Sequence, residues 1–123
     1  GTDGEDGSIQ GLLKAMDIPM IGTGVSGSAM SMSKLVAKRL LKEAGLPVNK
    51  FLHSHYADAK QYSFEEVVNS IGLPFMVKSS NLGSSVGVSK VKSKADFEIA
   101  VKDSYKYDDS ILFEEFITGR EIE

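Results

Sequence analysis

Two well-capped helix patterns, placed among four short strand patterns, dominate the second part of the chain. Ser63 and Glu66 form a capping box before the helix pattern at 64–71, and Ser93 is placed as the N-cap of a later helix pattern. The strand patterns are rich in β-branched or aromatic residues and cover 49–56, 74–80, 86–91 and 110–117. The order strand, helix, strand, strand, helix, strand predicts an α+β fold, a small antiparallel-type sheet with both helices on one face.

The preceding residues, 1–46, predict mostly helical structure that belongs to a different structural unit. One amphipathic helix is indicated by apolar residues at helical spacing, namely Ile9, Leu12, Leu13 and Met16. Asp6 or Ser8 is placed to cap the start of this helix. A second helix, which stops at Gly45, is indicated by the spacing of Met32, Leu35, Val36, Leu40 and Ala44. The change from one region to the other is expected within 44–49, so that the second region covers 47–123.

Composition limits the possible classes of protein. With 123 residues, 41% of them hydrophobic and 25% charged, the chain is typical of a globular protein with one modest core. Its formal charge of −3 is too small to indicate a nucleic-acid or membrane partner. The lack of cysteine excludes disulfides and thiolate metal sites, and it agrees with a cytoplasmic location. Because the sequence has no initiator Met and ends within a strand pattern, we expect both ends to be cut from a longer protein.

The stretch NLGSSVGVSKV, residues 81–91, is rich in glycine and serine and lies between two strand patterns. Gly83 and Gly87 bracket Ser84, Ser85 and a valine. Glycines let backbone N–H groups approach phosphate oxygens closely, and serine hydroxyls add further donors. Gly and Ser are equally ordinary residues of a β-hairpin turn. The local spacing leaves a phosphate-binding loop and a plain hairpin as open alternatives.

Two lysines bear on this choice. Alternation in the strand pattern at 74–80 puts Lys78 at a strand end next to the glycine-rich stretch, where a cation can meet a phosphate. Lys34 lies in the first turn of its predicted helix, where the helix dipole slightly disfavours a cation and an anionic partner would rationalise it. The alternative for both lysines is a solvated position, with the charged end in water.

The strand pattern at 110–117 contains adjacent carboxylates. Alternation sends Glu114 and Glu115 to opposite faces, so one of them lies on a partly apolar face and needs a partner there. That partner is a purine amino group, a ribose hydroxyl or a lysine, unless the charge only protects an edge strand from aggregation. His53 and His55 share one face of another strand, but no third metal ligand lies near them in the sequence, so we predict no metal site.

In this order, the segments resemble the D-alanine–D-alanine ligases of the ATP-grasp superfamily. The matching motifs are GEDGSIQGLL, IPMIGTGVSGSAMSMSK, AGLPV, LPFMVKSSNLGSSVGVSKV and LFEEFITGREIE, and they cover nearly the whole chain. The resemblance implies an N-terminal domain that ends in residues 1–46, followed by an incomplete central ATP-grasp domain in 47–123. A C-terminal catalytic domain would be absent from this chain.

The resemblance also implies a reaction. Ligases of this family use ATP and Mg²⁺ to phosphorylate the carboxylate of one D-alanine, and the amine of a second D-alanine then attacks the acyl phosphate. The product is a peptidoglycan precursor, made in the cytoplasm by an enzyme that we expect to be a homodimer. This chain alone would be inactive, since it lacks the expected metal ligands. The alternatives are a D-alanine–D-lactate ligase, another ATP-grasp carboxylate–amine ligase, a non-catalytic nucleotide-binding module, or a folding unit with no ligand.

Residue roles follow from the resemblance by position. Lys34 and Lys78 resemble the lysines that hold the nucleotide and its α-phosphate, and Ser84 resembles a catalytic serine that links the lid to the substrate side. The remaining cofactor-binding matches are the lid residues Gly83, Ser84, Ser85 and Gly87, the adenine hinge residues Glu114, Glu115 and Ile117, and the ribose ligand Glu121. Two positions depart from the family pattern, because Ser33 replaces an Asp before the first lysine and Ser79 replaces a Pro after the second.

Overall fold

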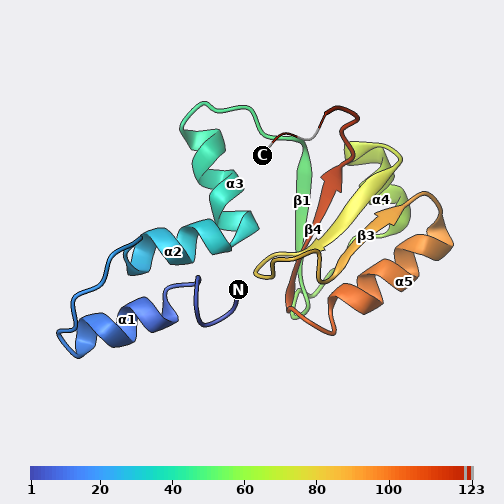
Figure 1. The fold of residues 1–123 in the computed structure, drawn as a ribbon. Helices are drawn as coiled ribbons and strands as arrows, with labels where there is room; N and C mark the ends of the chain where they lie inside the picture. The colour runs from blue at the N-terminus through green and yellow to red at the C-terminus, as the bar shows by residue number, and fades with distance from the viewer. Residues whose placement is uncertain (121, 123) are drawn as a thin grey trace. The chain divides into compact units, whose positions relative to one another are not determined.

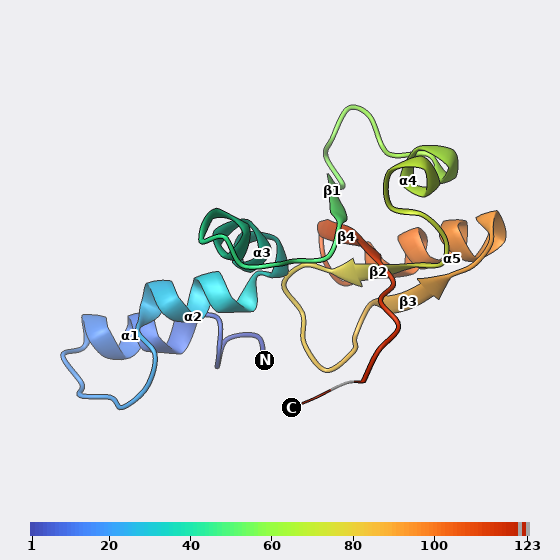
Figure 2. The same ribbon diagram turned by 90° about the horizontal axis from the view of Figure 1, so that it is seen from above.

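The computed structural model describes residues 1–120 and 122, and these residues form two compact units. Unit 1 consists of Gly1–Val48 together with Ser80–Val86. Unit 2 consists of Asn49–Ser79 and the described residues from Gly87 onward. Figures 1 and 2 show the ribbon of both units from two directions. Glu121, predicted to bind ribose, lies outside the described residues.

Unit 2 is a four-stranded antiparallel sheet with two helices. The strands are β1 (Phe51–His55), β2 (Phe75–Ser79), β3 (Val88–Val91) and β4 (Ser110–Glu115), in the spatial order β1-β4-β2-β3. The helices are α4 (Phe64–Ile71) and α5 (Lys94–Ser104), which lie on the same side of the sheet in Figure 1. The predicted order of elements and the α+β sheet with both helices on one face are therefore confirmed.

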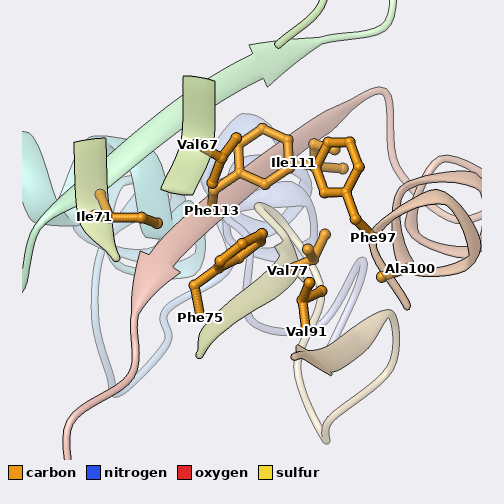
Figure 3. Close-up of a cluster of buried hydrophobic side chains, with 9 residues drawn as sticks. All are labelled: Val67, Ile71, Phe75, Val77, Val91, Phe97, Ala100, Ile111 and Phe113. Atoms are coloured by element: carbon orange, nitrogen blue, oxygen red, sulfur yellow. The ribbon is translucent and has the colours of Figure 1, made fainter. Parts of the chain in front are cut away.

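The core of unit 2 lies between the sheet and these helices. Phe75 and Val77 alternate with half-buried neighbours along β2. Phe113 and Ile111 of β4 belong to the same core, although the residues between and beside them, Leu112 and Glu114, are buried as well. Figure 3 shows these side chains meeting Val67 and Ile71 of α4 and Phe97 and Ala100 of α5, beside Val91 of β3. The rings of Phe75, Phe97 and Phe113 contact one another at centroid distances of 5.7–6.3 Å.

The caps of both helices agree with the sequence. Ser63 accepts a hydrogen bond from the Glu66 N–H, and the Glu66 carboxylate accepts from the Ser63 N–H, which completes the capping box of α4. Ser93 accepts from the Asp96 N–H at the start of α5. The hydrogen bonds to Lys60 and Ser63 lower the pKa of the half-buried Glu66 to about 2.

Unit 1 contains three helices and the glycine-rich loop. The helices are α1 (Ser8–Ala15), α2 (Val25–Met32) and α3 (Lys34–Glu43). Apolar side chains at helical spacing are exposed on α1 and α3, and neither helix buries a residue. No helix within residues 1–120 and 122 is long and apolar enough to cross a membrane.

Two sequence predictions about unit 1 were wrong. Met32 does not belong to the helix that contains Leu35, because the chain turns at Ser33, which ends α2 and caps α3. The small residues and weak amphipathicity of α2 gave no pattern to recognise. The N-cap of α1 is Gly7, with φ +100°, rather than Asp6 or Ser8. Asp6 lies one position before the N-cap, and its carboxylate accepts a hydrogen bond from the Ser8 N–H. This hydrogen bond lowers the Asp6 pKa.

Candidate functional site

A pocket of about 560 Å³ lies on the face of the sheet opposite the two helices, a size typical of small-molecule sites. Met76 and Lys78 of β2, Val88 of β3 and Glu114 of β4 contribute side chains from adjacent strands to this face. The lining is completed by Asn49, by Glu115 at the end of β4, and by Phe116, Ile117, Gly119 and Arg120 of the segment after β4. The pocket therefore combines apolar residues, a lysine–glutamate pair and residues of the irregular segment after β4.

Lys78 and Glu114 form an ion pair in this pocket. The Lys78 Nζ donates to Glu114 Oε2 at 2.8 Å, and the Glu114 side chain is only 4% exposed while that of Lys78 is 28% exposed. Because Lys78 lies opposite Leu112 and Met76 opposite Glu114, the two charged residues are diagonal neighbours across β2 and β4. The sequence left three possible partners for the buried carboxylate, a purine amino group, a ribose hydroxyl or a lysine. In the structure the Glu114 carboxylate is bound by a lysine, Lys78. The edge-strand explanation for Glu114 is wrong, since β4 lies inside the sheet.

The segment that follows β4 forms one wall of the pocket. β4 ends at Glu115, two residues earlier than the strand pattern indicates, and Phe116 and Ile117 continue without regular structure. The Lys90 ammonium lies 3.3 Å from the centroid of the Phe116 ring, a cation–π contact that holds this segment to β3. Ile117 is 65% exposed and still lines the pocket.

The two ends of the glycine-rich loop, Ser79 and Gly87, pack tightly against each other. The Ser79 N–H donates to the Gly87 carbonyl at 3.1 Å, and the Ser104 Oγ of α5 donates to the same carbonyl at 3.1 Å. Gly87 has φ +65°, and a Cβ built on it would lie 2.2 Å from Ser79 Oγ. Both the conformation and the space therefore require glycine here. The strand that follows begins at Val88 rather than at the predicted Val86.

The tip of the loop is a strained turn. The Val86 N–H donates to the Gly83 carbonyl at 3.1 Å, and the two central residues, Ser84 and Ser85, have φ of +51° and +62°. Left-handed conformations at both central positions favour Gly or Asn over Ser. The hairpin interpretation is confirmed, because β2 and β3 pair antiparallel on either side of the loop. Phosphate binding by the loop stays a prediction.

Lys34 lies at the first position of α3, as predicted, and the loop occupies the start of that helix. The Lys34 N–H donates to the Ser80 carbonyl at 2.9 Å, and the Leu35 N–H to Ser80 Oγ at 3.5 Å. Ser33 Oγ accepts from the Val36 N–H, and the Lys34 ammonium donates to the Leu82 carbonyl. Protein groups thus take the first three N–H groups of α3, so this helix start has no further N–H at those positions to offer a phosphate.

The two histidines of β1 are bonded within the protein. The ring of His53 shares a hydrogen bond with Ser110 Oγ at 2.9 Å, and His55 Nδ1 accepts from the Ala57 N–H. Within the described part of the chain, no group of three or more His, Cys, Asp or Glu side chains could hold a metal ion.

Comparison with known proteins identifies the family. The family model described as the D-ala D-ala ligase C-terminus matches residues 40–123. The whole chain is 50% identical to 34% of the D-alanine–D-alanine ligase A of Chromobacterium violaceum, and 47% identical to 34% of the Escherichia coli K12 protein of that name. The D-alanine–D-alanine ligase of Coxiella burnetii has a similar structure, with a TM-score of 0.89 at 37% identity over 98% of this chain and 36% of that chain.

The chain belongs to the D-alanine–D-alanine ligase family. The predicted family and ATP-grasp fold are thereby confirmed. The chain spans about a third of the length of these relatives. Which ligase domains units 1 and 2 represent, and what each predicted site residue binds, stay predictions.

Sequence reasoning found part of the pocket in this family member. Lys78, Glu114, Glu115 and Ile117 were predicted and meet in one pocket. Six lining residues were missed, namely Asn49, Met76, Val88, Phe116, Gly119 and Arg120. Met76 and Val88 had a usable signal, because alternation and pairing put them on the face of Lys78. Asn49 had none, because its role depends on a partner 66 positions away.

Proposed function

We propose that this chain supplies nucleotide-binding elements of an ATP-dependent D-alanine–D-alanine ligase. In that reaction ATP phosphorylates the carboxylate of one D-alanine, and the amine of the second displaces phosphate to form the peptide bond. The observation that carries the proposal is the Lys78–Glu114 pair in a pocket that Glu115, Phe116 and Ile117 also line. Cytoplasmic location and a homodimer of the longer protein are part of the same proposal.

The ion pair supports a functional role more than a structural one. A buried salt bridge can often be replaced by apolar residues with no loss of stability, so folding alone does not require it. An ammonium has three N–H donors, and one of those of Lys78 is oriented by Glu114. Phosphoryl transfer depends on positive charge held in position, which is the role we assign to Lys78.

The rest of the pocket fits an adenine nucleotide. Met76, Val88 and Ile117 offer apolar surface for a purine ring, and the Glu115–Ile117 backbone offers hydrogen-bonding groups for its edge. Glu121 is proposed as the ribose ligand by resemblance alone. The resemblance likewise supports Lys34, Gly83, Ser84, Ser85 and Gly87 as phosphate-binding residues. Mg²⁺ would offset phosphate charge in the complete enzyme, and no ligand for it is assigned here.

Titration of the 123-residue chain with ATP, followed by amide chemical shifts, tests the proposal. We expect shifts at Lys78 and at Glu114–Ile117. The test variant is Lys78→Met with Glu114→Gln, which removes both charges and leaves no buried unpaired carboxylate. It should remain folded and bind ATP about tenfold or more weakly, the loss expected for a charge-assisted contact.

Lys60→Met with Glu66→Gln is the matched control. It removes another Lys–Glu pair of unit 2, at 2.6 Å, on the protein surface and away from the pocket lining. ATP affinity should not change in this control. Equal affinity in the wild type and the Lys78 variant would show that the pocket pair does not bind the nucleotide, and the proposal would be wrong.

A further inference from the structure

The ladder between β1 and β4 changes just past its regular end, at Glu115. The Glu115 N–H donates to the Lys50 carbonyl at 2.9 Å, as a continued antiparallel pair would. The Lys50 N–H, however, donates to the Glu115 side chain, at Oε2, over 3.1 Å. The Glu115 carbonyl accepts instead from the side-chain amide of Asn49, at 3.1 Å from Nδ2. The main-chain hydrogen bond from the Lys50 N–H to the Glu115 carbonyl is thus replaced by two hydrogen bonds that involve side chains, those of Glu115 and Asn49.

This exchange occurs at the edge of the pocket. Asn49 and Glu115 both line it, and Asn49 is half-buried at the point where the chain enters β1. A carbonyl oxygen has two lone pairs, so the Glu115 carbonyl can accept from Asn49 and from one further donor. The amide of Asn49 therefore sets the direction in which this carbonyl presents its second lone pair.

We propose that Asn49 is a positioning residue for recognition of the nucleobase, acting through the Glu115 carbonyl. A purine with a 6-amino group donates to such a carbonyl, whereas a 6-oxo group would face it lone pair to lone pair. A site built to accept from a donor discriminates strongly against a ligand that lacks one. Asn49 thereby favours adenine over guanine nucleotides. The inference rests on the proposed nucleotide-binding function and adds a residue to it.

The experiment compares ATP, GTP and inorganic tripolyphosphate as ligands of the 123-residue chain. Asn49→Ala removes the amide, and Asn49→Asp keeps its size but replaces the donor with an acceptor. We expect the ATP dissociation constant to rise about five- to tenfold in both variants, the effect of one hydrogen bond. GTP and tripolyphosphate should bind as in the wild type, so the preference for ATP over GTP falls by the same factor.

Asn69→Ala is the matched control, since Asn69 is an exposed residue of α4 in the same unit. It should leave all three affinities unchanged. Amide spectra of each variant establish that it is folded, and Asn49→Asp, as the closest match in size, serves if Asn49→Ala is not. A purely structural role for Asn49 predicts equal weakening of ATP, GTP and tripolyphosphate.

The outcomes separate this inference from the proposed function. If the wild type binds neither ATP nor tripolyphosphate, the nucleotide-binding function itself fails, and the role of Asn49 fails with it. If the wild type binds ATP but both Asn49 variants keep its preference over GTP, the function stands and the role of Asn49 is overturned. A loss of preference confined to the Asn49 variants supports both.

Discussion

The amphipathic helices α1 and α3 of unit 1 and the helices α4 and α5 of unit 2 were all indicated by the sequence, but their apolar faces are buried to very different extents. In unit 2, α4 and α5 bury their apolar faces against β2, β3 and β4. In unit 1, α1 and α3 bury no residue, and Leu12 and Leu40 are 54% and 47% exposed. All the buried apolar residues of the described chain belong to unit 2. An amphipathic pattern therefore shows that a helix has an apolar face, and does not show what covers that face.

The largest expected effect is a cavity in the core of unit 2. Phe75 is fully buried and contacts the rings of Phe64, Phe97 and Phe113. Phe75→Ala should lower the free energy of unfolding of unit 2 by about 3–5 kcal/mol. Leu12→Ala on the exposed face of α1 should change stability by less than about 0.5 kcal/mol. Urea denaturation, followed by amide signals from each unit, measures both; equal effects would mean that the burial difference does not set stability.

The next largest effect is expected at the base of the glycine-rich loop. Gly87→Ala introduces a side chain at positive φ and against Ser79 Oγ, and it should destabilise unit 2 by about 2–4 kcal/mol. Gly83→Ala is the control, because a Cβ there meets nothing within 4 Å. Adding Ser79→Ala should recover part of the loss, since it removes the closer of the two clashing atoms. A double-mutant cycle in urea denaturation checks this, and no recovery would assign the whole effect to backbone strain.

A smaller, pH-dependent effect is expected at the capping box of α4. Folding lowers the Glu66 pKa to about 2 from the ordinary 4.5, so the native state favours the ionised carboxylate. The ionised Glu66 carboxylate therefore stabilises the folded state fully above about pH 4.5, and this stabilisation is lost as pH falls through about 2. The protection of the α4 amides against hydrogen exchange, taken relative to the intrinsic exchange rate at each pH, should fall between those values more in the wild type than in Glu66→Gln. The same slope in both proteins would show that another group titrates.

The fold of unit 2 could be predicted from the sequence more completely than that of unit 1. The helix N-caps and strand alternation of unit 2 are local signals that agree with one another, so its fold and the opposite faces of Phe75 and Lys78 were predictable. The break at Ser33 was not, because α2 has small residues in place of an apolar stripe. Asn49 contacts Glu115, and Phe116 contacts Lys90, and both residues line the pocket. Contacts of this kind depend on tertiary placement and leave no periodic trace in the sequence.

The smallest expected effect lies at the tip of the loop, which belongs to unit 1 although both of its ends lie in unit 2. Ser85, at φ +62°, occupies a conformation that costs a non-glycine residue about 1–2 kcal/mol, while glycine loses about 0.5–1 kcal/mol of chain entropy. Ser85→Gly should therefore slow amide exchange at Val86, whose N–H closes the turn, by a factor corresponding to about 0.5–1 kcal/mol. Ser89→Gly, in the regular strand β3, should instead accelerate local exchange, because there glycine only adds entropy to the unfolded chain.

The Ser85 variant also shows whether that strain serves the proposed function. A strained serine persists when its side chain or backbone is needed in that position, as is common at ligand-binding sites. If Ser85→Gly tightens the turn and weakens ATP binding, the hydroxyl explains why serine is retained at a position that favours glycine. If the turn is tighter and ATP binds as before, the strain has no counterpart in nucleotide binding, and Ser85 should be removed from the set of phosphate ligands.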